Sequence, residues 1–396
     1  MKNKPSLQVL YTAGTLIVFL FLTPGITQTA PTHSHVDLGV RPNVDGVMIS
    51  KLPDPSKENL ERSKIQLMRQ GRMSAVAVLE RIWLSPLKKA IATRARSEAA
   101  AEYEKRSADP RGFEIFGVNQ TQINPTSTTT AAFINREEEY KGIAKIEYGV
   151  CWGVTTMNRR FAQLAFFPSV TSLTKPEDLL PDSVSRRKDW IKEIIRRVEY
   201  VMEGQAQIFP GIRNIRELTL IPEVERHLKV LTVKAWRNLA IRPWDRKFFT
   251  DTTEPMTPDS RNALVEDLER RISRHELPKL MFTKQTSGKS FGVPYWIHTV
   301  LATGVKRLDG GTIHIMVWDP DFYGEDYPDV ATSVEIRPDG SMLYRPWYRK
   351  NDPEWSDRLG QVFYAPENNS ETLMIEKSLL KFCEKRSELC VIPAEQ

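Results

Sequence analysis

Several signatures that reveal function in other chains are missing from these 396 residues. There is no His-Glu-x-x-His, no Cys-x-x-Cys and no glycine-rich phosphate loop, so the sequence predicts neither a metal nor a nucleotide cofactor. Lys and Arg (56) exceed Asp and Glu (50) only slightly, and the basic clusters carry no interleaved aromatic residues. Nucleic-acid binding needs a concentrated basic patch, so we expect no nucleic-acid partner.

Long apolar runs are also scarce. The run at 16–22 follows Lys2 and Lys4, and no further charged residue occurs before Asp37. This pattern predicts a secretory signal peptide over residues 1–30, with an uncleaved membrane anchor as the alternative. We therefore expect a secreted or periplasmic protein. No other stretch is long and apolar enough to span a membrane, so no stable insertion beyond this segment is expected.

Cysteine is rare as well, with three residues. Cys383 and Cys390 are close in sequence, and such a pair in an exported protein is expected to form a disulfide. That pairing leaves Cys151 as the odd thiol. A free thiol in an oxidising compartment is a liability unless it is buried or has a function.

The order of the remaining patterns predicts an α+β fold. Residues 31–110 are expected as a mobile leader and helical segment, and the Gly-, Asn-, Pro- and Thr-rich stretch 108–130 as a linker into a main domain over 111–396. Helical periodicity covers 151–165, 182–203, 223–239, 260–274 and 371–384. The period of strands covers 280–282, 295–305, 312–318, 330–336 and 341–348. Helices thus come first and antiparallel strands later.

Two of these strands carry polar residues that chemistry can use. If the turn between them is a two-residue loop at 309–310, His298 lies opposite Asp321. Because side chains alternate along a strand, His298 then shares a face with apolar residues of both strands and with Asp319. We expect a histidine and one or two carboxylates at the open end of an otherwise apolar hairpin.

Cys151 lies between Gly149 and Gly153 at the start of a helical pattern. Apolar residues recur through 154–165, while Arg159 and Arg160 fall on the other face, which predicts a partly buried helix with Cys151 in its first turn. The unpaired N–H groups and the dipole at such a position favour a thiolate. The alternative is a buried structural cysteine.

These two regions fit one catalytic arrangement. A histidine oriented by a carboxylate can activate a thiol, and the thiol then attacks a carbonyl carbon. The sequence therefore offers Cys151 as nucleophile, His298 as base and acid, and Asp319 as the residue that orients the imidazole.

The motifs also resemble a known family. Gly-Val-Cys-Trp-Gly at 149–153, the strand from Ile297-His298 to Gly304, and the pair Asp319-Pro320 resemble the papain-like cysteine peptidase superfamily. They are nearest to its bacterial Cys-His-Asp members, such as the double-glycine leader peptidases. The resemblance covers roughly 140–325. It implies a helical part carrying Cys packed on an antiparallel sheet carrying His and Asp, and a peptide or protein substrate cleaved through a thioester.

The chain departs from this family at one position. Papain-like enzymes usually place an oxyanion-hole Gln six residues before the cysteine, where this chain has Lys145; Gln120 and Gln122 lie further upstream. Two alternative functions remain. One is a transglutaminase-like acyl transferase, because Gly-Val-Cys-Trp in this chain also resembles the nucleophile motif of transglutaminases. The other is a catalytically inactive papain-like binding module at the cell envelope.

Overall fold

The computed structural model describes residues 6–12, 15–21, 65, 68, 85–109, 112–122, 126, 128–135, 137–143, 150–168, 187–237, 257–290, 293–321, 332–345 and 357–390. The chain forms two compact units, Met1–Ala95 and Arg96–Gln396. In the first unit, β1 (Ser6–Thr12) pairs antiparallel with β2 (Thr15–Phe21). Within the ranges given above, no helix is both long and apolar enough to cross a membrane.

Seven α-helices are described, and most of them build the helical half of the second unit. They are α3 (Ser85–Ser107), α4 (Cys151–Leu164), α5 (Arg187–Met202), α6 (Ile215–Thr219), α7 (Pro222–Arg237), α8 (Pro258–Ser273) and α9 (Asn368–Cys383). Short 3-10 turns η3 (Glu114–Gln122), η4 (Glu137–Tyr140), η9 (Asp309–Gly311) and η12 (Ser387–Leu389) and the parallel pair β3 (Ala165–Phe166) and β4 (Gln207–Ile208) complete the connections. One apolar cluster around α4 joins residues of α5, α6, α7 and α9, and we call it the helical cluster.

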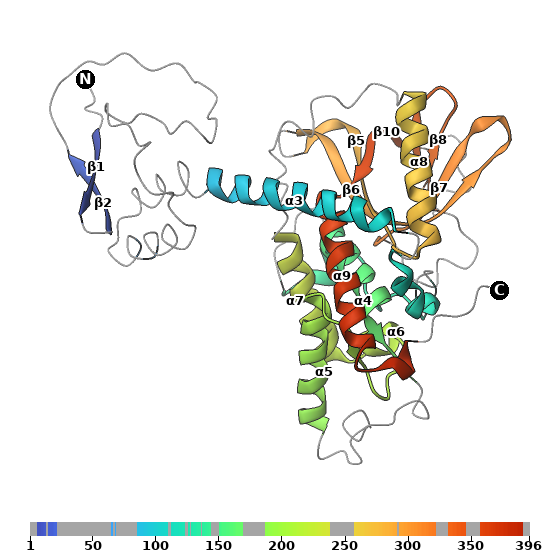
Figure 1. The fold of residues 1–396 in the computed structure, drawn as a ribbon, viewed down its shortest axis with the longest axis horizontal. Coiled ribbons are helices and arrows are strands. Elements are labelled where there is room, and N and C mark those ends of the chain that lie inside the picture. Colours follow the sequence, from blue (N-terminus) through green and yellow to red (C-terminus); the bar gives the residue numbers. More distant parts are fainter. Residues whose placement is uncertain are drawn as a thin grey trace. The chain divides into compact units, whose positions relative to one another are not determined.

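The strands form a separate layer. They are β5 (Lys279–Ser290), β6 (Val293–Arg307), β7 (Ile313–Trp318), β8 (Ser333–Ile336), β9 (Met342–Arg345) and β10 (Asp357–Tyr364). Every pairing is antiparallel, and β10 pairs with both β5 and β9, so the sheet closes on itself. Its interior is a second apolar cluster, the sheet cluster, which Val265 and Leu268 of α8 extend. Figure 1 shows α8 beside the curled sheet, and α5 and α6 further from the sheet than α4.

The predicted α+β class is confirmed, as is the disulfide between Cys383 and Cys390. The predicted linker at 108–130 is wrong. Phe113 and Phe116 are buried in the helical cluster, and Phe113 stacks on Tyr103. Aromatic side chains outweigh the turn-forming residues around them, because burying each ring removes a large apolar area from water. The sequence pattern does not predict strand β10.

The register of the β6–β7 hairpin is as predicted only at its open end. There Leu301 pairs with Trp318, whereas nearer the tip Gly304 pairs with Met316, one residue out of the predicted register. The tip holds η9 and is longer than the expected two-residue loop. One extra residue on β6, Thr303, forms a bulge that absorbs the difference.

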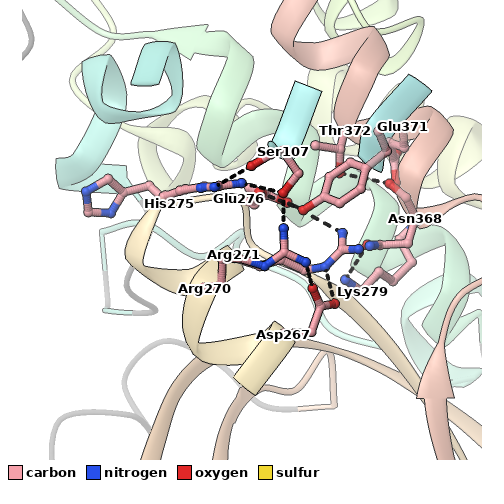
Figure 2. A network of polar contacts seen from close by, with 12 residues as sticks. Ser107, Asp267, Arg270, Arg271, His275, Glu276, Lys279, Asn368, Glu371 and Thr372 are labelled. Carbon is pink, nitrogen blue, oxygen red and sulfur yellow. Dashed lines mark hydrogen bonds and ion pairs between the residues drawn. The ribbon is translucent and has the colours of Figure 1, made fainter. Parts of the chain in front are cut away.

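A network of polar contacts joins residues of α8, α9 and β5 (Figure 2), and it includes residues of α4. Arg159, expected on an exposed face, is fully buried, and its guanidinium donates to Glu371, Asn368 and Thr372 of α9. The other end of this network is Lys279, the first residue of β5, whose Nζ lies 2.8 Å from Glu371 Oε2. The network thus ties α4, α9 and the sheet together.

Glu371 carries most of the charge compensation. Its carboxylate contacts Arg159, Arg160 and Lys279 and is 2% exposed. Burial alone would raise the pKa of Glu371, but the three cations, Lys279 foremost, lower it well below its ordinary value. The stabilisation is therefore fully present above the unfolded pKa of about 4.3 and is lost as the pH falls through the folded value.

Replacing Glu371 tests this network. Glu371→Gln removes the carboxylate that the three cations share, and among the described residues only Lys279 keeps a second one, Glu367 at 3.1 Å. We expect the substitution to lower the free energy of unfolding at pH 7 by about 3–5 kcal/mol. Chemical denaturation measures the loss. Glu269→Gln, which breaks an exposed pair with Arg307, is the control and should cost at most about 1 kcal/mol. Equal effects of the two substitutions would contradict the assignment.

Candidate functional site

Cys151 is the first residue of α4, as predicted, and is a free thiol that is partly exposed. The helix begins without a side-chain cap at Val150, whose carbonyl accepts the N–H of Val154. The predicted apolar residues of α4 are buried, and so are Arg159 and Gln163, which makes α4 a central helix rather than a partly buried one. The thiol therefore lies at the positive end of a rigidly packed helix.

Gly153 explains how α4 fits so close to its neighbour. A Cβ atom built on Gly153 would lie 2.0 Å from the carbonyl oxygen of Thr232 on α7. No side chain other than hydrogen fits that space, so the glycine two positions after Cys151 fixes the distance between α4 and α7.

Gly153→Ala should push α4 away from α7 and lower the free energy of unfolding by about 1–3 kcal/mol or more. Thermal and chemical denaturation measure this loss. Gly304→Ala is the matched control, because the nearest atom to a Cβ at that position is Met316 Cγ at 3.4 Å, an ordinary contact. A Gly153→Ala protein as stable as the Gly304→Ala protein would show that the helices do not pack this closely.

His298 and Asp319 lie together at the end of the sheet. His298 is on β6 and pairs with Phe282 of β5, and its ring lies against Phe282 and Tyr344 of the sheet cluster. Asp319 directly follows β7, and its Oδ1 lies 2.9 Å from His298 Nε2. The exposed fractions are 1% and 0%. The predicted histidine–carboxylate pair is thus present, buried and hydrogen-bonded.

A second carboxylate faces the same nitrogen. Asp321 Oδ2 lies 3.9 Å from His298 Nε2, and the backbone N–H of Asp321 donates to Asp319 Oδ1 at 2.8 Å. Burial opposes the charged imidazole, but Asp319, then Asp321, raise the pKa of His298 well above its ordinary value. A hydrogen bond with Cys151 acts in the same direction.

The Cys151 thiol therefore lies within hydrogen-bonding reach of the His298 imidazole, although the residues next to them belong to different clusters. One turn along α4 from Cys151, Thr155 Oγ1 donates to the backbone carbonyl of Thr299 at 2.9 Å, in the buried interior. This bond fixes the first turn of α4 against the β6 residue next to His298. Of the three residues named from the sequence, His298 and Asp319 are hydrogen-bonded to each other, and Cys151 lies close to the imidazole.

Asn135 was missed by sequence reasoning. Its Nδ2 donates to Asp321 Oδ1 at 2.7 Å, its Oδ1 accepts the backbone N–H of Val150, and its own N–H donates to the carbonyl of Pro320 at 2.8 Å. Asn135 lies only a few residues beyond the stretch 108–130 that the sequence predicts as a linker. No local pattern distinguishes this asparagine from others in a turn.

The same residues are the best metal-ligand candidates in the part of the chain that the structure describes. Ligand atoms of His298, Asp319 and Asp321 lie within 4.8 Å of one another. However, His298 Nε2 and Asp319 Oδ1 are hydrogen-bonded to each other, and a cation would have to break that bond. We therefore assign these side chains to proton chemistry. Lys145 and Gly149 lie outside the described residues.

A cavity of about 360 Å³ opens on another face of α4, next to Trp152. Its lining has charges of both signs, including Arg160, Lys279 and Glu371, which already neutralise one another. It adds no reactive group to the site.

Comparisons with protein-family models, with curated proteins and with solved structures found no match for this chain. The function must therefore be argued from the geometry of these residues.

The two carboxylates make unequal contributions to the charge on His298, and this is measurable. Asp319→Asn should lower the pKa of His298 more than Asp321→Asn, because Asp319 is nearer and hydrogen-bonded. Since the folded pKa is raised, the linked stabilisation is present below about pH 6.5 and is lost as the pH rises through the folded value. NMR titration of the imidazole C–H signals measures this order, with His227 as the internal reference. The reverse order would contradict the assignment.

Proposed function

We propose that this protein is a thiol hydrolase that cleaves peptide or other amide bonds through Cys151, and that its fold is papain-like. The observation that carries the proposal is the buried His298, which lies beside Cys151, the one cysteine outside the disulfide. Two carboxylates raise the pKa of this histidine. An imidazolium next to a thiol at a helix N-terminus favours the thiolate, the form that attacks carbonyl carbons.

The reaction follows from these contacts. The thiolate of Cys151 attacks the carbonyl carbon, and the carbonyl π electrons move to oxygen. The imidazolium of His298 then gives its proton to the leaving amine as the C–N bond breaks, which leaves a thioester. His298, now neutral, takes a proton from water, and the hydroxide attacks the thioester to release the acid and the thiolate. Asp319 holds Nε2 throughout, so Nδ1 is the nitrogen that serves the sulfur.

The negative oxygen of the tetrahedral intermediate needs donors. The first N–H groups of α4 have no partner within the helix, and we assign the N–H of Cys151 to this role. Such a donor is backbone, so the exchange of the family's Gln for Lys145 does not remove it.

The same thioester could pass its acyl group to an amine instead of water. The Gly-Val-Cys-Trp motif is the observation that favours this second reading. Release of acid that is unaffected by an added primary amine supports hydrolysis, whereas formation of a new amide at the expense of acid supports transfer. The expected export, by a signal over residues 1–30, remains part of the proposal.

Alkylation of Cys151 tests the proposal before any substrate is known. We expect iodoacetamide to react rapidly at pH 7, and His298→Ala to slow the reaction about 30-fold, because an ordinary thiol with a pKa of about 8.5 is only about 3% ionised at that pH. Mass spectrometry locates and times the label. His227→Ala is the control, because His227 contacts Glu199 away from the thiol. Slow alkylation that does not depend on His298 would rule out the thiolate mechanism and leave a binding module.

A further inference from the structure

The nucleophile and its base stand on separate parts of the molecule. Val150, immediately before Cys151, belongs to the helical cluster, while the ring of His298 lies against Phe282 and Tyr344 of the sheet cluster. A small slide of one cluster over the other would separate sulfur from imidazole. Reacting groups must be held within a fraction of an ångström, so a contact that spans this junction at the site matters for the chemistry.

Asn135 makes that contact. One amide group reaches both sides of the site, because its Oδ1 accepts the N–H of Val150 and its Nδ2 donates to Asp321 Oδ1. The backbone of Asn135 adds a third bond, to the carbonyl of Pro320. Asp321 in turn donates its N–H to Asp319, the carboxylate that orients His298. A continuous chain of hydrogen bonds thus runs from the start of α4 to the imidazole.

The chemistry of the partners explains why an amide stands at this position. The N–H of Val150 requires an acceptor, and the carboxylate of Asp321 requires a donor. A carboxylate at position 135 would satisfy the first and repel the second. The two partners also fix which end of the amide is oxygen, since the opposite orientation would place an NH₂ group against an N–H group.

We infer that Asn135 is a positioning residue that sets the separation of Cys151 and His298 by clamping Val150 to Asp321. The inference rests on the proposed function for its catalytic meaning, but the clamp itself can be tested independently of reactivity.

Four variants separate the clamp from a general structural role. Asn135→Ala removes both side-chain bonds and should lower the alkylation rate of Cys151 at pH 7 about tenfold. Asn135→Asp sets two carboxylates against each other and should be at least as slow. Asp321→Asn keeps an acceptor for the amide but removes a charge beside His298. The double variant Asn135→Asp with Asp321→Asn reverses donor and acceptor, restores both bonds, and should recover the rate of Asp321→Asn alone.

Two further measurements decide between the possible outcomes. Hydrogen exchange at the Val150 amide should be slow in the native protein, fast in Asn135→Ala and slow again in the double variant, whatever the reactivity of Cys151. Asp189→Asn, on an exposed turn of α5, is the control and should change neither rate. The clamp is overturned if Val150 exchange ignores position 135, or if the double variant remains as slow as Asn135→Asp. Slow alkylation of the native protein, with the exchange pattern intact, would instead overturn the proposed function.

Discussion

The rest of this structure depends on the ion pair of a fully buried arginine on α4. Arg159 could not be placed in an apolar interior alone, because an unpaired buried charge is very costly. Glu371 of α9 compensates it, and the same carboxylate also pairs with Lys279 of β5. The start of α4 and the strands β6 and β7 are therefore attached to the same polar network, through α4 itself or through β5 of the sheet. Apolar packing builds the two clusters, and charge decides how they join.

The site lies at the same junction of helices and sheet, at the start of α4, whereas the network lies further along that helix. Its logic is similar, because buried groups of opposite charge are placed where two layers meet. The two groups of residues differ in how their charges are balanced. Around Glu371 three cations surround one carboxylate, which suits a permanent structural role. Around His298 two carboxylates share one imidazole beside a thiol, which suits a proton that must move.

Much of this arrangement could be predicted from local patterns. The start of α4 at Cys151 and the face shared by His298 and Asp319 follow from periodicity, which depends only on neighbouring residues. The rest depends on distant partners. β10 is recognised as a strand only by its pairing with β5 and β9, and Arg159 is buried only because Glu371, 212 positions away, meets it. Asn135 is the extreme case, since its three partners lie on two distant segments.

The bulge at Thr303 has a consequence for how this hairpin can change. A bulge between tip and base means that the tip can gain or lose a residue while the strand end that holds His298 keeps its alternation. A change of length in the β6–β7 turn therefore leaves the position of His298 at the other end of the hairpin unchanged. The outer end of β6–β7 is a part of the molecule where evolution, or an engineer, could insert new sequence and leave the reactive groups where they are.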